Sequence, residues 1–287
     1  MRRLDDPLSP LIDQLHKDGR LRVWSLVITI FGDAIQPRGG RVSTARLQEI
    51  LERMRIEPGA LRTALSRLAK EGWVIREREG RRSFYRLSSK GIAEFEPATR
   101  RIYAPVQIDA GKDWILGLAV DRSARAKIEV DVLASQGLVL GVGGFLWQAN
   151  EAPDPEWLRK RGILTVTGQL NDVPPAFKLA VAPEALRSAY QKLMTDFSDL
   201  EAADLAPLDA FVARILLVHH WRRIVLRAPE LPIALQPKDW PAAKGRGFVA
   251  QLYRDLVAVS EPWLDRPVAG GMTTLPPPDT SFSRRFS

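Results

Sequence analysis

The spacing of hydrophobic positions changes twice along the chain. In residues 8–103 apolar side chains recur at the period of an amphipathic helix, and a short alternating pattern near the end indicates a β-hairpin. Residues 106–168 instead show short apolar runs interrupted by one helical segment, which is typical of strands joined by a helix. Long helical patterns return in residues 182–264. These changes predict an α+β protein.

The same changes divide the chain into three expected domains. We expect a first domain at residues 1–104, a middle α/β domain at residues 105–175 and a helical carboxy-terminal domain at residues 176–287. The apolar fraction of 45% is sufficient to build a core in a chain of 287 residues. The segment after residue 267 is rich in Gly, Pro, Ser and Thr, which favours a loose tail.

The first domain contains its elements in a recognisable order. They are an apolar helix at residues 21–35, an amphipathic helix at 43–54, a second amphipathic helix at 58–71, and two strands at 73–79 and 83–87. Pro58 suits a first helical turn, where its missing N–H has no partner in any case, and Gly72 ends the helix. Two helices, a basic helix and a basic-tipped hairpin together predict a winged helix-turn-helix.

The basic helix has one apolar and one polar face. The apolar face holds Leu61, Ala64, Leu65, Leu68 and Ala69, and the polar face holds Arg62, Thr63, Ser66, Arg67 and Lys70. In a helix-turn-helix this helix lies in the major groove of DNA. A charged face is also typical of a helix that is merely solvated, so the order of the elements is what favours DNA binding.

Each polar residue of this helix has an expected role. Arg62 and Arg67 are candidates for base contacts, because an arginine can donate two hydrogen bonds to guanine. Thr63 and Ser66 are short enough to contact bases or phosphates. Lys70 is expected at a phosphate, where it would set position rather than sequence preference.

The hairpin tip and the overall charge favour the same partner. Arg81 and Arg82 place two cations at the tip, from which they can reach the adjacent DNA backbone or minor groove. The chain carries a formal charge of +8 with a pI near 10.0, which also favours an anionic partner. Because one winged helix contacts only a short site, we expect a homodimer on double-stranded DNA, with its interface beyond residue 105.

Cysteine and histidine usage argues against several classes of enzyme. The chain has no cysteine, which excludes thiolate catalysis and cysteine-ligated zinc and fits a reducing cytoplasm. Its three histidines are His16, His219 and His220, and adjacent helical residues such as the last two do not share a face. With no glycine-rich phosphate loop or Ser-His-acid order, we expect no catalytic residue, metal or cofactor. The apolar run at residues 23–31 is too short to cross a membrane.

Several segments carry a resemblance to a known family. They are FGDAIQPRGG, LRTALSRLAKEGWV, GRRSFYRLSSKG and RRIY in the first half, and LLVHHWRRIVLRAPELPIALQPKDWP near the carboxyl end. These segments resemble the PaaX family of repressors of phenylacetic acid catabolism operons, and the likeness covers nearly the whole chain. The resemblance implies a homodimeric transcriptional regulator that an aryl-acyl-CoA, typically phenylacetyl-CoA, releases from its operator.

The helical segment at residues 208–229 is the candidate site for such an effector. CoA needs cations for its phosphates, and an aryl group needs an apolar slot. The residues that could combine these properties are His220, Arg222, Arg223 and Trp240. The plainer alternative is a charged outer face, because we expect the arginines of this helix, Arg214 included, to lie outside the core.

The middle domain resembles the ferredoxin-like fold of a small CRISPR-associated nuclease. Its strands are expected at residues 114–120, 138–142, 144–148 and 163–170, and its helix at 123–137. Such nucleases place an aspartate after the first strand, and Asp121 stands there. A metal-dependent nuclease is therefore the alternative function, although an aspartate after a strand is more often a helix cap or turn residue. A regulator without an effector, or a structural DNA-binding protein, is a third hypothesis.

Overall fold

A computed structural model divides the protein into two compact units. The described residues are 6–17, 22–105, 113–119, 125–135, 137–141, 143–201, 203–227, 231–267 and 274–287. The first unit joins Met1–Pro105 with Lys192–Arg223 and Gly245–Ser287, and the second joins Val106–Gln191 with Ile224–Lys244. The carboxy-terminal helices are thus shared between the units. No helix in the described ranges is long and apolar enough to cross a membrane.

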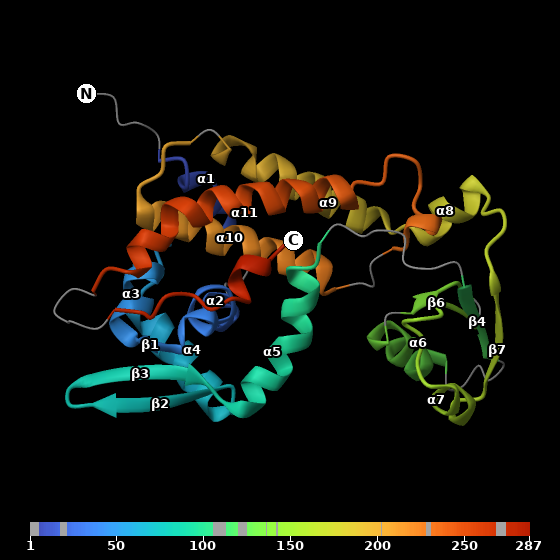
Figure 1. Ribbon diagram of the computed structural model, residues 1–287, viewed down its shortest axis with the longest axis horizontal. Coiled ribbons are helices and arrows are strands. Elements are labelled where there is room, and N and C mark those ends of the chain that lie inside the picture. The colour runs from blue at the N-terminus through green and yellow to red at the C-terminus, as the bar shows by residue number, and fades with distance from the viewer. Residues whose placement is uncertain are drawn as a thin grey trace. The chain divides into compact units, whose positions relative to one another are not determined.

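The amino-terminal part of the first unit combines helices with a small sheet (Figure 1). Its helical elements are α1 (Ser9–Lys17), α2 (Val23–Ile30), the π-helical turn η1 (Phe31–Ile35), the 3₁₀ turn η2 (Gln36–Arg38), α3 (Thr44–Arg53), α4 (Pro58–Lys70) and α5 (Ser89–Ile102). Its strands are β1 (Arg41–Ser43), β2 (Val74–Glu79) and β3 (Arg82–Leu87). The three strands are antiparallel and lie in the order β1-β3-β2.

Local sequence signals fix the ends of these elements. The Ser43 hydroxyl accepts a hydrogen bond from the backbone N–H of Arg46 and so caps α3. Pro58 occupies the first turn of α4, and Gly72, with a φ of +76°, follows its end. Gly80, with a φ of +58°, makes the tight turn between β2 and β3.

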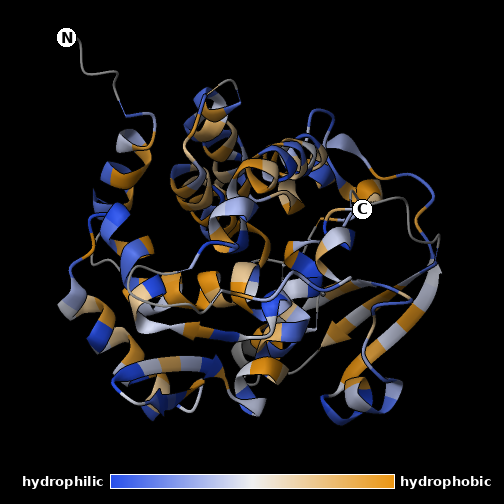
Figure 2. Ribbon diagram, turned by 60° about the vertical axis from the view of Figure 1, so that its left-hand side comes forward, coloured by the Kyte–Doolittle hydropathy of each residue, from blue (hydrophilic) through white to orange (hydrophobic). Residues whose placement is uncertain are grey.

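Parts of the carboxy-terminal helices contribute to the core of the first unit. These helices are α9 (Glu184–Phe197), the 3₁₀ turn η3 (Ser198–Leu200), α10 (Pro207–Val225) and α11 (Ala242–Leu264). Every residue of α10 from Ala210 to His219 is buried, which explains why this stretch has no polar stripe. The expectation that the arginines of this helix lie outside the core is wrong for Arg214, whose side chain has no exposed surface. Figure 2 shows that other helices carry both hydrophobic (orange) and hydrophilic (blue) residues, as expected for amphipathic helices.

The last described segment, residues 274–287, packs against the first unit. It contains the 3₁₀ turn η5 (Phe282–Arg284), after which Arg285 and Phe286 are buried. The backbone N–H of Phe286 donates to the Tyr103 carbonyl over 2.9 Å. The composition predicted a loose tail, but this part of it is held by contacts to residues far away in the sequence.

The second unit is built on a four-stranded antiparallel sheet. Its elements are β4 (Asp113–Ala119), α6 (Arg125–Ala134), β5 (Leu138–Val139), β6 (Gly144–Gln148), α7 (Pro155–Lys160), β7 (Ile163–Gln169), α8 (Pro175–Val181) and the 3₁₀ turn η4 (Ile233–Leu235). The strands lie in the order β5-β6-β4-β7. Its core consists of Ile128, Val132, Phe145, Trp147, Leu158 and Ile163. Helices and antiparallel sheets in both units confirm the predicted α+β class, whereas the short helices α7 and α8 were not expected.

Candidate nucleic-acid interface

The polar face predicted for α4 is exposed. Arg62, Thr63, Ser66, Arg67, Lys70 and Glu71 line one open surface on this helix. On the opposite side the buried residues are Leu61, Ala64, Leu65 and Leu68. Ala69, which was expected with them, is exposed near the end of the helix. The apolar face therefore anchors α4 while its polar face remains open to a partner.

The two arginines of this face differ in how they are held. Arg62 and Lys70 make no hydrogen bond or ion pair with any described residue, so all five N–H donors of Arg62 are available. Arg67 Nε donates to Glu71 Oε1 over 2.7 Å, and its guanidinium carbon lies 5.0 Å from the ring centre of Trp24. Arg62 is therefore the better candidate for a base contact.

The β2–β3 hairpin carries the other predicted cations. Arg81 and Arg82 lie exposed at its tip. Along the strands, Nε of Arg86 and Nε of Arg41 both donate to Glu77, over 2.5 and 2.9 Å. Hydrogen bonds from Arg86 and then from Arg41 lower the pKa of Glu77, so this carboxylate stays ionised at neutral pH. Glu77 thus compensates Arg41 of β1 and Arg86 of β3, whereas Arg81 has no partner in the described parts of the chain.

A further exposed cation on the hairpin, Arg78, was not predicted as a contact from the sequence. Arg78 is exposed on β2, opposite Ser83 in the register, and pairs with no residue whose position is described. Its neighbour on the same strand face, Arg76, donates to the Ser83 hydroxyl over 2.8 Å. The signal was present, because alternate residues of a strand lie on one face.

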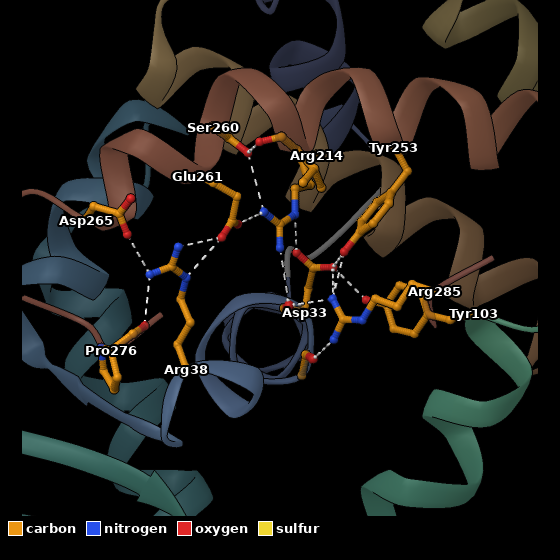
Figure 3. Close-up of polar contacts among 12 residues, drawn as sticks. Asp33, Arg38, Tyr103, Arg214, Tyr253, Ser260, Glu261, Asp265, Pro276 and Arg285 are labelled. Carbon is orange, nitrogen blue, oxygen red and sulfur yellow. Dashed lines mark hydrogen bonds and ion pairs between the residues drawn. The ribbon is translucent and has the colours of Figure 1, made fainter. Parts of the chain in front are cut away.

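A buried ionic cluster lies inside the first unit (Figure 3). Asp33 in η1 has no exposed side-chain surface and lies between Arg214 of α10 and Arg285 of the tail. Its Oδ2 is 2.7 Å from Arg214 Nε, and its Oδ1 is 3.1 Å from Arg285 Nη1. Tyr103 and Tyr253 both donate their hydroxyls to Oδ1, over 2.6 and 2.9 Å. The Asp33 carboxylate is thus surrounded by donors.

The electrostatics keep both arginines of this cluster charged. Burial alone would lower the pKa of Arg214, but Asp33, Tyr253 and Glu261 together outweigh burial and raise it. Burial likewise opposes the charge of Arg285, and the acidic groups around it raise its pKa overall. Burial raises the pKa of Tyr253 to about 12 and that of Tyr103 well above its usual value, so both hydroxyls remain donors. These raised pKa values keep both arginines charged and both tyrosines protonated at neutral pH, so their contacts with Asp33 have a structural role.

Glu261 of α11 extends the cluster toward η2. Its carboxylate accepts from Arg214 Nη1 over 2.5 Å and from Arg38 Nε over 3.1 Å. Arg38 also donates to Asp265 and to the Pro276 carbonyl, over 2.9 Å in each case. A continuous series of ion pairs therefore joins the amino-terminal helices to α10, α11 and the tail (Figure 3).

The predicted effector residues on α10 have unequal surroundings. Arg222 Nη1 donates to the Ser25 carbonyl and to the Thr29 hydroxyl, over 3.1 Å in each case. Burial lowers the pKa of Arg222, against a smaller effect of Tyr103 that raises it. His220 packs its ring at 5.7 Å from the ring centre of Phe197. Arg222 therefore serves at present as a link between α10 and α2.

The remaining two effector candidates belong to different units. Arg223 is half-buried on α10 in the first unit. Trp240 belongs to the second unit, where its ring centre is 6.5 Å from that of Tyr190 and 5.2 Å from the guanidinium carbon of Arg187. The Trp240 Nε1 is buried and has no acceptor there. His220, Arg222 and Arg223 thus share one helix, and Trp240 does not.

No catalytic arrangement emerges from the described residues. Burial lowers the pKa of His219 to about 3, and its Nδ1 shares a hydrogen bond with the Thr29 hydroxyl over 3.1 Å, so this histidine is a neutral core residue. Within the ranges given above, no group of three or more His, Cys, Asp and Glu side chains could hold a metal. Asp121, on which the nuclease hypothesis rests, lies outside those ranges.

Two family models and one relative point to the same family. The model described as PaaX-like protein matches residues 22–91, and that described as PaaX-like protein C-terminal domain matches residues 182–266. The transcriptional repressor PaaX of Escherichia coli (strain K12) is 29% identical over 286 residues, covering 91% of this chain and 89% of that protein. Among solved structures, the uncharacterized protein Rv0674 from Mycobacterium tuberculosis is similar with a TM-score of 0.52 at 20% identity, covering 75% of this chain and 88% of that one. The structural likeness supports the fold alone.

Proposed function

Because the chain belongs to the PaaX-like protein family, we propose that it is a transcriptional repressor of an aromatic-acid catabolic operon of the phenylacetate type. The E. coli relative is named as a transcriptional repressor, and this chain covers most of its length. In this proposal the protein acts by occupying operator DNA and catalyses no reaction. No observation on the described residues supports the nuclease alternative.

The order of elements around α4 supports a winged helix-turn-helix. Helices α3 and α4 follow one another closely, and the β2–β3 hairpin comes directly after them and pairs with β1. In the second unit, the connectivity β–α–β–β–α–β with strand order β5-β6-β4-β7 supports a ferredoxin-like domain. The observation that carries the proposal is the exposed face of α4, on which Arg62 and Lys70 have no partner among the described residues.

The chemistry of this face suits the major groove. Arg62 has free donors for the O6 and N7 atoms of a guanine, which would give preference for one base. Lys70 at the end of α4 suits a phosphate, which would fix the register of the helix on the duplex. Arg78 and Arg81 on the hairpin suit the neighbouring backbone, whose negative charge attracts cations of any arrangement.

The proposal extends to a homodimer and an aryl-acyl-CoA effector such as phenylacetyl-CoA. His220, Arg222 and Arg223 of α10 remain the proposed contacts of this effector in the first unit. A phosphate at Arg222 would compete with its bonds to α2, and α2 packs against α4. A ligand shifts the equilibrium between two conformations only if it binds one of them more tightly. An effector that binds only after Arg222 has released α2 would have such a preference. The dimer would set the spacing of two half-sites.

Operator binding tests the proposal directly. Fluorescence anisotropy with DNA from upstream of the protein's own operon should show binding that exceeds binding to scrambled DNA. Arg62→Ala should weaken specific binding by about 1–3 kcal/mol and relax preference at one base position. Phenylacetyl-CoA should release the complex more effectively than acetyl-CoA.

The matched control is Arg254→Ala, which removes an exposed arginine from α11. Its operator affinity should equal that of the wild type. Equal losses in the two variants would mean that only overall charge matters, and α4 would then not be the base-contacting helix. Binding to scrambled DNA as strong as binding to the operator would overturn the repressor proposal.

A further inference from the structure

A cavity of about 280 Å³ lies between β1 and the carboxy-terminal tail in the first unit. Its polar lining includes Arg38, Arg41 and Arg46, and its apolar lining includes Val42, Phe84 and Leu275. The tail is fixed beside it, because Arg38 Nη1 donates to the Pro276 carbonyl over 2.9 Å. The cavity is therefore bounded by two segments that lie far apart in the sequence, and guanidinium groups and apolar side chains share its wall.

Arg46 is the least balanced cation of this wall. Its side chain is only 3% exposed, and its buried Nε has no acceptor among the described residues. The guanidinium carbon lies 4.3 Å from the ring centre of Trp263, and Nη2 donates to the backbone carbonyl of Arg266. Its ion-pair partner, Glu49, is 3.3 Å away and 40% exposed. A buried cation normally has closer compensation than this.

Two other buried arginines have their charge compensated by a buried carboxylate. Arg214 and Arg285 both contact the buried carboxylate of Asp33, and their pKa values are raised. For Arg46 the effect of burial exceeds that of Glu49, and its pKa is lowered. An anion placed in the cavity would add to the partial compensation that the exposed Glu49 gives Arg46.

Arg41 offers a second set of donors beside Arg46. Its Nε donates to Glu77 over 2.9 Å and its Nη2 donates to Glu79, which leaves Nη1 without an acceptor among the described residues. Its guanidinium carbon lies 3.7 Å from the ring centre of Phe84. A flat guanidinium over an aromatic ring presents its edge to a carboxylate or phosphate in a defined direction.

From these contacts we propose that the cavity binds a small organic anion, in which one oxyanion group contacts Arg46 and Arg41 and an apolar body lies against Val42, Phe84 and Leu275. The volume suits an aryl or short alkyl carboxylate and is below the usual range for large cofactors. The occupant would contact β1, the first turn of α3 and the tail together. This site is separate from the DNA-contacting face of α4 and from the proposed effector residues on α10.

The test is a titration of the full-length, DNA-free protein with four probes: benzoate, acetate, inorganic phosphate and the uncharged benzamide. Calorimetry should show saturable binding of benzoate, weaker binding of acetate and phosphate, and no binding of benzamide. Hydrogen exchange should slow at residues 41–46 and 274–276 when benzoate is bound. Arg41→Gln, at a half-buried position, should weaken benzoate binding about tenfold.

Leu275→Trp fills the cavity without removing a charge and should abolish benzoate binding, while Arg254→Gln should leave it unchanged. Thermal unfolding of each variant establishes that it is folded before titration. Equal binding of benzamide and benzoate would overturn the anion site, as would unchanged benzoate affinity in both cavity variants or no binding of any probe. Phosphate binding tighter than benzoate binding would overturn the organic part of the proposal. None of these results depends on operator DNA, so the proposed function is tested separately.

Discussion

Arg62 and Arg214 are both arginines on helices of the first unit, and their surroundings are opposite. Arg62 is exposed on α4 and has no partner among the residues that the structure describes. Arg214 has no exposed surface and contacts Asp33 and Glu261. An exposed arginine contributes little to stability and is free to bind a partner, whereas a buried arginine is tied to the charges that compensate it.

The two regions therefore have different roles within one compact unit. The exposed face of α4 is suited to binding a partner, and the cluster around Asp33 is suited to stabilising the fold. The face of α4 can lose a charge without disturbing the core, because its apolar face carries the packing. The cluster around Asp33 cannot, because removing one member leaves another charge buried without compensation. Substitutions should therefore affect either DNA affinity or stability, according to which of the two regions they change.

The largest effect is expected for Asp33→Asn, which leaves Arg214 and Arg285 without their shared carboxylate. The free energy of unfolding should fall by about 3–5 kcal/mol, as for other buried ion pairs that lose one partner. Urea unfolding measured at neutral pH tests this value. The exposed Asp204→Asn is the control and should change stability little. A loss in Asp33→Asn no larger than in the control would mean that the cluster does not stabilise the fold.

A smaller loss of stability is expected for Arg285→Ala. Asp33 keeps Arg214 in this variant, but the bonds from Arg285 Nη1 to the Asp33 carbonyl and from Nη2 to the Gly32 carbonyl are removed. Stability should fall by about 1.5–3 kcal/mol, the range for hydrogen bonds to charged groups. The neighbouring Arg284 is exposed, so Arg284→Ala is a matched control in the same turn. Hydrogen exchange of residues 274–287 should rise only in Arg285→Ala, and equal rates would contradict the anchoring role.

The contrast also explains what the sequence could reveal. The two faces of α4 and the turn at Gly80 are local patterns, so the exposed surface and the hairpin were predicted from neighbouring residues. Asp33 lies 181 positions from Arg214 and 252 from Arg285. No local pattern links residues at such distances, and a charged helix without an apolar stripe looked solvated. The buried cluster and the packed tail were therefore missed.

In the second unit, too, only some of the helices and strands were predicted from the sequence. Apolar runs bounded by turn residues predicted β4, β6 and β7 close to their observed positions. Helices α7 and α8 span only Pro155–Lys160 and Pro175–Val181, which is too short for a helical period to emerge. The sharing of the carboxy-terminal helices between two units depends on tertiary packing and has no signature in composition.

A moderate effect of pH is expected from His219, a buried residue that shares α10 with Arg214. Burial first, and then nearby cations, lower its pKa from 6.5 to about 3 in the folded state. As pH falls below 6.5, the unfolded chain binds a proton that the folded protein does not, so stability decreases until the pH reaches the folded pKa. The loss between pH 6.5 and pH 5.5 should be about 1 kcal/mol.

His219→Gln removes this titration, so its free energy of unfolding should depend less on pH over that interval than that of the wild type. Urea unfolding at several pH values measures both slopes. Identical slopes in the wild type and His219→Gln would mean that His219 accepts a proton in the folded state.

The smallest effect, and the sharpest test of the contrast, is expected for Glu71→Gln. Glu71 pairs with Arg67 on the exposed face of α4, and exposed pairs of this kind contribute at most about 0.5 kcal/mol to stability. Removing the carboxylate should leave the free energy of unfolding nearly unchanged. It should free Arg67 for the DNA and remove a like charge from beside the phosphates, so operator affinity should rise about twofold.

Glu201→Gln removes the same charge from an exposed position outside α4 and should leave operator affinity unchanged. Weaker operator binding in Glu71→Gln would mean that Glu71 holds Arg67 in its binding geometry, and the exposed pair would then resemble the buried cluster in having a fixed structural role.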